Sequence, residues 1–175
     1  LEFMNYYTEV CAWRPDGRRI QFALNSENGR WEEWKGNGRR DPASYICCLQ
    51  NNGPGIYTLH DATNGVETYQ HYGVSPDGLK YFRAYIVERR NEHGETWTFT
   101  GMPHLQKVTH SSGRSVHFGW TNGRVTQVID PAGQVYRYGY DARGLLASAT
   151  LPGPPDTMIT YHYEDARHPG ALTGK

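Results

Sequence analysis

The stretch Gly133–Gly153, GQVYRYGYDARGLLASATLPG, decides the fold class of this chain. Tyr136, Tyr138 and Tyr140 recur at every second position, and the DARG that follows has the residue types of a turn. Because successive side chains of a strand point to opposite faces, the three tyrosines share one face of a half-buried strand. A second apolar run, LLASATL, comes after the turn. The stretch therefore predicts a β-hairpin.

This unit recurs along the chain, with leading positions at Gly94, Gly113, Gly133 and Asp156, at intervals of 19, 20 and 23 residues. The repeat predicts an all-β fold of antiparallel β-hairpins that form a continuous curved or spiralling sheet. Asp141 is expected to accept hydrogen bonds from backbone amides of the turn that follows it. The other residues expected to carry the repeat architecture are aromatic positions and turn glycines: Phe118, Trp120, Tyr136, Tyr138, Tyr140, Tyr161, Tyr163, Gly133, Gly144 and Gly170.

The repeat differs in clarity between two parts of the chain. Residues 1–3, LEF, resemble a cloning remnant ahead of Met4. Residues 4–90 are interpreted as degenerate copies of the repeat, with a long loop near residues 35–55 where glycine, proline and charged residues gather. Residues 91–175 carry the clear hairpin repeats, the last of them truncated at the C-terminus. The strand register within residues 35–93 does not follow from the sequence.

Composition argues against several classes of function. Eighteen basic and 18 acidic residues give a formal net charge of zero, which disfavours a nucleic-acid binder. No apolar stretch approaches the roughly 20 residues of a spanning helix, so membrane insertion is not expected. The three cysteines and eight histidines of the chain show no metal-ligand spacing, so neither a metal nor a cofactor is expected.

The sequence also shows no catalytic motif. Ser111 and Ser112 lie near His110 without a nucleophile-elbow pattern, and the carboxylates of Glu164 and Asp165 are sequence neighbours that would point to opposite faces of a strand. The segment DPAG at 130–133 is interpreted as an ordinary turn. The sequence therefore predicts a protein that is not an enzyme.

Residues 130–153, DPAGQVYRYGYDARGLLASATLPG, and 159–174, ITYHYEDARHPGALTG, closely resemble the tyrosine-aspartate (YD), or Rhs, repeat. The namesake dipeptide is Tyr140-Asp141, and the next copy has Tyr163-Glu164-Asp165. Bacterial Rhs polymorphic toxins, insecticidal toxin complexes and animal teneurins share this repeat. The resemblance implies a secreted or delivered bacterial effector for interbacterial competition, whose shell encapsulates a C-terminal toxin domain. The partners would be the rest of the parent chain and the enclosed toxin.

Two further expectations stay open at this point. The tyrosines could instead be exposed in a cell-surface adhesin or carbohydrate-binding repeat module, because flat rings with polar tips also suit sugars. Unpaired strand edges could let the segment form a homo-oligomer. The toxin, the secretion route, the organism and the target do not follow from these residues.

Overall fold

The computed structural model describes residues 2–4, 9–14, 16–48, 55–71 and 82–175. These residues form antiparallel strands and no helix, which confirms the predicted all-β class. None of the described residues belongs to a helix that could cross a membrane. The chain divides into two compact units, residues 1–99 and 100–175, and within each unit the strands pair with their neighbours in sequence.

The described residues of the first unit form nine strands, most of them joined as consecutive hairpins. They are β1 (Glu2–Met4), β2 (Glu9–Trp13), β3 (Arg19–Asn25), β4 (Arg30–Gly36), β5 (Arg39–Cys48), β6 (Ile56–His60), β7 (Val66–His71), β8 (Phe82–Arg90) and β9 (Thr96–Thr100). Strand β1 pairs with β2 and also with the start of β8, through Glu2 opposite Arg83 and Phe3 opposite Phe82. The end of β8 pairs with β9 instead. The first eight strands therefore close on themselves, and Glu2 and Phe3 of the suspected cloning remnant take part in that closure.

Closure encloses a hydrophobic core in the first unit. Phe22, Ile46 and Val10 are fully buried, and each comes from a different strand. The register places Val10 opposite Phe22 and Ile46 opposite Leu59, so apolar residues face one another across neighbouring strands. The remaining buried members of this cluster are Ala12, Trp31, Tyr57, Tyr69 and Ala84. Burying a large side chain of this kind contributes roughly 1.5–3 kcal/mol, so this core dominates the stability of the unit.

The long loop predicted near residues 35–55 is wrong over residues 39–48, which form β5. Asn37 and Gly38 have positive φ and connect β4 to β5 by a tight turn, since Gly36 pairs with Arg39. The register then jumps from Glu33 opposite Asp41 to Glu32 opposite Tyr45. The intervening residues, which include Pro42, form a bulge. Because residues of a bulge are not paired in the ladder, the bulge accommodates a proline, which has no backbone N–H to donate. Residues 49–54 of the predicted loop lie outside the described residues.

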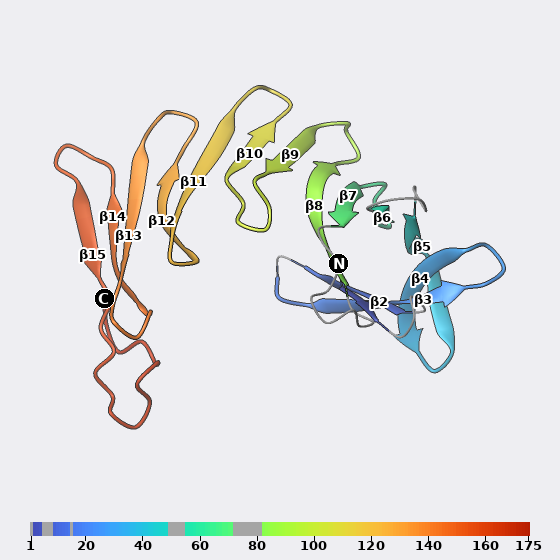
Figure 1. Ribbon diagram of the computed structural model, residues 1–175, viewed down its shortest axis with the longest axis horizontal. Helices are drawn as coiled ribbons and strands as arrows, with labels where there is room; N and C mark the ends of the chain where they lie inside the picture. Colours follow the sequence, from blue (N-terminus) through green and yellow to red (C-terminus); the bar gives the residue numbers. More distant parts are fainter. Residues whose placement is uncertain (1, 5–8, 15, 49–54, 72–81) are drawn as a thin grey trace. The chain divides into compact units, whose positions relative to one another are not determined.

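The second unit is a single antiparallel layer in which successive hairpins lie side by side (Figure 1). Its strands are β10 (Lys107–His110), β11 (Ser115–Thr121), β12 (Arg124–Ile129), β13 (Val135–Tyr140), β14 (Leu146–Leu151) and β15 (Thr157–Thr160). After β15 the chain makes a single bridge, between His162 and Gly174, in place of a returning strand. Residues 107–151 thus hold the regular hairpin repeats.

One face of this layer is apolar. The register aligns Phe118, Val128 and Tyr136 across β11, β12 and β13. It also places Tyr138 of β13 opposite Ala149 of β14. The shared face that the alternation predicted for Tyr136 and Tyr138 is therefore present. Only Ala149, 4% exposed, is buried among the residues of the second unit, whereas the aromatic rings of this face are half-buried. The described residues of the chain therefore cover this face only in part.

Candidate functional site: the tyrosine-aspartate turns

Asp141 begins a five-residue turn, Asp141–Leu145, that joins β13 to β14. The backbone N–H of Asp141 donates to the carbonyl of Leu145 at 2.9 Å, and that of Gly144 donates to the carbonyl of Asp141 at 2.9 Å. Gly144 has a φ of 83°, the left-handed conformation that closes a type I turn with a bulge. The Oδ1 atom of Asp141 accepts the backbone N–H groups of Arg143 and Leu145, both at 2.9 Å. Asp141 therefore makes the hydrogen bonds expected of it.

The same turn recurs at other hairpins. Asp130 repeats the arrangement, since its Oδ1 accepts the backbone N–H groups of Ala132 at 2.8 Å and Gln134 at 2.9 Å. Gly133 stands in this turn where Gly144 stands in the next one, with a φ of 81°. The turns that begin at Asp61 and Asn91 also use the Oδ1 atom of their first residue in this way. The aspartate of the repeat is thus a turn-forming residue.

Charge stabilises the Asp141 turn further. The Oδ2 atom of Asp141 lies 2.8 Å from Nε and 2.7 Å from Nη2 of Arg143. The hydrogen bond from the Leu145 backbone, together with the Arg143 guanidinium, lowers the pKa of the Asp141 carboxyl below its ordinary value. The hydrogen bonds and the ion pair of this carboxylate thus all lie within its own turn.

Tyr140 connects its hairpin to the preceding one. Its hydroxyl donates to the backbone carbonyl of Val125 on β12 at 2.8 Å. The hydroxyl of Tyr163 does the same to the carbonyl of Leu146 on β14 at 3.0 Å. One repeat earlier, the indole N–H of Trp120 donates to the carbonyl of Leu105 at 2.7 Å. The aromatic residue at this position of the repeat therefore anchors each hairpin to the one before it.

Arginine side chains cover the same anchors. The Arg124 guanidinium lies 5.7 Å from the centre of the Tyr140 ring, and that of Arg143 lies 5.8 Å from the centre of the Tyr163 ring. These separations are within the range of a cation–π interaction. Each arginine belongs to the hairpin that the anchoring residue contacts. The tyrosine therefore contacts the same neighbouring hairpin twice, through its hydroxyl and through its ring.

A glycine precedes two of the anchors and lets the strands bend there. The pairing shifts register between Gly119 and Trp120, and again between Gly139 and Tyr140. A Cβ at Gly139 would lie 2.5 Å from the Ser148 hydroxyl oxygen, so the glycine permits close approach of the neighbouring strand. The sequence interpretation missed both bulges. The Gly-aromatic pairs at 119 and 139, 20 residues apart, are the signal that would have identified them.

The remaining predicted residues are placed as follows. Tyr161 and Tyr163 are half-buried, and Trp120 is 36% exposed. Gly170 lies in the turn before Ala171, whose N–H donates to the His168 carbonyl, and it is not among the glycines with positive φ. The predicted repeat residues therefore lie on the second unit, some on its apolar face and others as anchors or in turns. They do not converge on a reacting centre.

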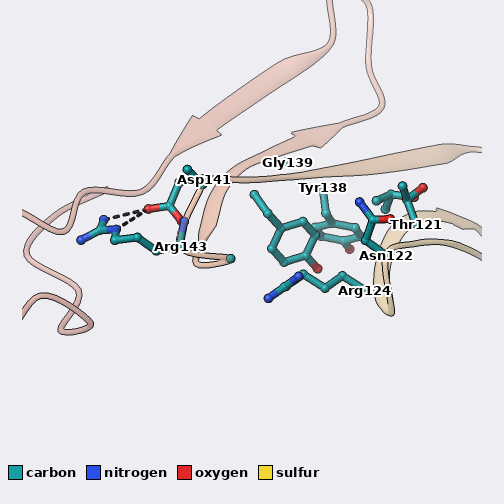
Figure 2. A pocket seen from close by; sticks show the side chains of 11 residues that line it. Thr121, Asn122, Arg124, Tyr138, Gly139, Asp141 and Arg143 are labelled. Atoms are coloured by element: carbon teal, nitrogen blue, oxygen red, sulfur yellow. Dashed lines mark hydrogen bonds and ion pairs between the residues drawn. The ribbon is translucent and has the colours of Figure 1, made fainter.

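A shallow polar groove of about 460 Å³ lies between the ends of two successive hairpins, lined by residues 121–126 and 138–144. Figure 2 shows Asn122, Arg124 and Tyr138 around it, with the ion pair of Asp141 and Arg143 to one side. The part of the chain that the structure describes contains no group of three side chains placed to hold a metal ion.

The first unit contains a polar cluster that no sequence pattern indicated. Arg14 donates from Nη1 and Nη2 to the two carboxylate oxygens of Glu67, at 2.6 and 2.9 Å. The Tyr69 hydroxyl also donates to Glu67, at 2.6 Å. Burial and the adjacent carboxylate raise the pKa of Tyr69 well above its ordinary value. Since each side chain is satisfied by the others, the cluster fixes the turn after β2 against β7.

Comparison with known proteins agrees with the repeat geometry. Residues 119–154 match the family model described as the RHS repeat. The match begins at the first Gly-aromatic bulge and ends after β14, so it includes the Tyr140 anchor and the Asp141 turn. No curated protein matches the chain. The predicted resemblance to the Rhs repeat is confirmed over residues 119–154.

Proposed function

Because this chain carries an Rhs repeat, we propose that it is a structural segment of an Rhs-type toxin, in which the repeats build a hollow β shell. The shell encloses and protects a C-terminal toxin domain of the same polypeptide until delivery into a competing bacterium. The segment performs no reaction of its own, and its contribution is containment. The parent polypeptide is secreted or delivered as an effector.

The observation that carries this proposal is the partly covered apolar face of the second unit. Phe118, Tyr136 and Tyr138 lie on one face of a single layer and are only half-buried. A sheet with one apolar face requires a cover, because exposing such a face to water is unfavourable. An enclosed polypeptide, or a further part of the wall, supplies that cover.

The link between hairpins supports the same proposal. Tyr140 and Tyr163 each bind the backbone of the preceding hairpin, and arginine side chains cover their rings. An interaction that each repeat makes with its neighbour can extend over any number of repeats. The hairpins of a wall are then held together by side chains as well as by strand pairing.

The test uses the native polypeptide that contains this segment, purified without denaturant from its own cells. Intact mass and peptide mapping are expected to give a much larger chain that retains a cleaved C-terminal fragment. Limited proteolysis should leave that fragment intact until the wall is unfolded. A native product little larger than this segment, or a C-terminal region that protease removes at once, would contradict the shell.

Partial exposure of the same rings favours a second function, a cell-surface adhesin or carbohydrate-binding module. In that case the tyrosines contact sugar and need no polypeptide cover. A glycan titration monitored by tryptophan fluorescence separates the two functions. Trp120 reports on binding because it lies on the second unit and is 36% exposed. Saturation with one particular sugar, by a polypeptide that holds no C-terminal fragment, would favour the module. Association of separate copies through free strand edges is proposed for the isolated segment only.

A further inference from the structure

The dipeptide Asn-Gly occurs at five places in the chain, at residues 28–29, 37–38, 52–53, 64–65 and 122–123. Asparagine before glycine deamidates readily, because glycine has no Cβ to hinder the approach of its backbone nitrogen to the preceding side chain. Residues 52–53 lie outside the described residues. The asparagine of each of the other four pairs is exposed, so exposure does not distinguish these pairs.

Hydrogen bonds hold both halves of the first pair. The Asn28 side chain donates from Nδ2 to the Glu32 carboxylate at 2.9 Å, and its Oδ1 accepts the backbone N–H of Arg30 at 3.0 Å. The backbone N–H of Gly29 donates to the Asn25 carbonyl at 2.9 Å. The attacking nitrogen and the side-chain amide are therefore both bound to other groups, and these hydrogen bonds must break before the two can react.

A carboxylate holds the pair at residues 64–65 in a similar way. The backbone N–H of Gly65 donates to Oδ1 of Asp61 at 2.8 Å. A hydrogen bond to an ionised acceptor is stronger than one between neutral groups. Asp61 also packs so closely on Gly65 that a Cβ at that position would overlap its carboxylate. The attacking nitrogen of this pair is therefore held away from the Asn64 side chain.

The pairs at residues 37–38 and 122–123 form two-residue turns of the same geometry. The two asparagines have φ values of 50° and 51°, and the two glycines have φ values of 74° and 73°. Positive φ at both central residues is the mark of a type I′ turn. Among the described residues, neither the side-chain amides nor the glycine N–H groups of these turns have a hydrogen-bond partner. The reacting atoms are therefore not held apart.

We propose that Asn37 and Asn122 are sites of spontaneous deamidation, whereas Asn28 and Asn64 are protected. The glycine backbone nitrogen attacks the asparagine Cγ atom, the Cγ–Nδ2 bond breaks, and ammonia leaves with the glycine proton. A succinimide remains, and solvent water opens it at either carbonyl to give aspartate or isoaspartate. The reaction thus consumes water, releases ammonia and replaces a neutral side chain by a carboxylate. It is independent of the proposed shell, because it needs only the turns themselves.

The new carboxylate at position 122 acts on the neighbouring anchor. Asn122 and Arg124 line the same groove (Figure 2), and the Arg124 guanidinium lies 5.7 Å from the centre of the Tyr140 ring. In the next turn, the Asp141 carboxylate pairs at 2.7 Å with Arg143, which also lies two residues after it. A carboxylate at position 122 attracts the Arg124 guanidinium in the same way and draws it from the tyrosine ring. Deamidation therefore weakens the contact between two successive hairpins.

The test is incubation of the 175-residue protein in heavy-oxygen water at slightly alkaline pH, followed by peptide mapping with mass spectrometry. Heavy oxygen in the new carboxyl group marks each deamidation that occurs during the incubation. Asn37 and Asn122 are expected to react about tenfold or more faster than Asn28 and Asn64, because the protected pairs must first lose hydrogen bonds.

The same protein unfolded in denaturant is the control, in which all four pairs should react at comparable rates. Comparable rates at the four pairs of the folded protein, or faster reaction at Asn28 or Asn64, would overturn the assignment. A ranking that stays the same in denaturant would overturn it as well, because the turns would then have no influence on the rates.

The variant Asn122→Asp reproduces one product and tests its effect on the anchor. NMR of the labelled protein follows the Arg124 side chain, whose signals are shifted by the ring current of Tyr140. We expect these signals to move toward those of an arginine without a stacked ring. The matched control, Asn64→Asp, adds the same charge to a turn in which Val66 takes the place of the arginine, and should leave them unchanged. Unchanged Arg124 signals in Asn122→Asp, or an equal shift in the control, would refute the effect.

Discussion

Replacing Tyr140 by phenylalanine tests the contribution of a single hydrogen bond between two hairpins. The substitution removes the hydroxyl that donates to the Val125 carbonyl at 2.8 Å, while the ring under Arg124 stays in place. A hydrogen bond of this kind contributes about 0.5–1.5 kcal/mol net to stability. We expect the free energy of unfolding to fall by about 1 kcal/mol and the melting temperature to fall by roughly 2–4 °C.

Tyr138→Phe is the matched control, because Tyr138 lies two residues away on the same strand. Its hydroxyl has no hydrogen-bond partner among the described residues, so its removal should change stability by less than about 0.5 kcal/mol. Urea unfolding monitored by far-UV circular dichroism gives the free energy of unfolding of both variants. Unchanged m-values check that each variant unfolds in the same transition as the wild type. Equal losses in the two variants, or a loss in Tyr138→Phe alone, would refute the anchor.

Three further predictions concern turns and the buried polar cluster. Gly144→Ala should lower the thermal stability of the protein more than Gly133→Ala does. Both glycines have positive φ, which costs about 1–2 kcal/mol for a residue with a side chain, but only the new methyl group at position 144 would also overlap the Arg124 guanidinium. Equal losses of stability in the two variants would contradict this. The folded state lowers the pKa of the Asp141 carboxyl. The difference in unfolding free energy between wild type and Asp141→Ala should therefore be constant above about pH 5 and shrink as the pH falls below about 4. A difference that grows on acidification would contradict the stabilising role of this carboxylate in its turn. Glu67→Gln should lower the free energy of unfolding by about 3 kcal/mol, because it leaves the half-buried Arg14 without its charge partner; a loss below about 0.5 kcal/mol would show that the ion pair is not structural.

The sequence predicted the local features of the second unit because those features are periodic. Alternation placed Tyr136 and Tyr138 on one face, and the register confirms it. Turn chemistry predicted the role of Asp141, whose side chain binds the two following amides. Both patterns arise from interactions between residues that are near in sequence, so a single chain is enough to reveal them.

Other features depend on residues far apart in the chain and left no periodic signal. The pairing of β1 with β8 joins Glu2 to Arg83, and the buried ion pair joins Arg14 to Glu67. The predicted loop near residues 35–55 failed for a different reason, since a bulge around Pro42 hides the strand that contains it. Propensity favours a loop at that proline, and pairing with β4 and β6 overrides it.

The extent of burial does not follow from the local pattern. Alternation predicted that the tyrosines share one face of a half-buried strand, and the described residues leave the rings of Tyr136 and Tyr138 half-buried. Alternation identifies which face is apolar, but how far that face is covered depends on what packs against it. A direct measurement of how far this face is covered therefore tests the proposed function.

Hydroxyl-radical footprinting of that face makes the measurement, on the isolated 175-residue segment and on the native polypeptide that contains it. Phe118, Tyr136 and Tyr138 are expected to be modified in the segment and at least several-fold protected in the native polypeptide, because the enclosed domain or a further part of the wall covers them. Met158, 67% exposed on the last strand, serves as the reference for radical dose within the segment. Equal modification of the three rings in both samples would contradict the shell.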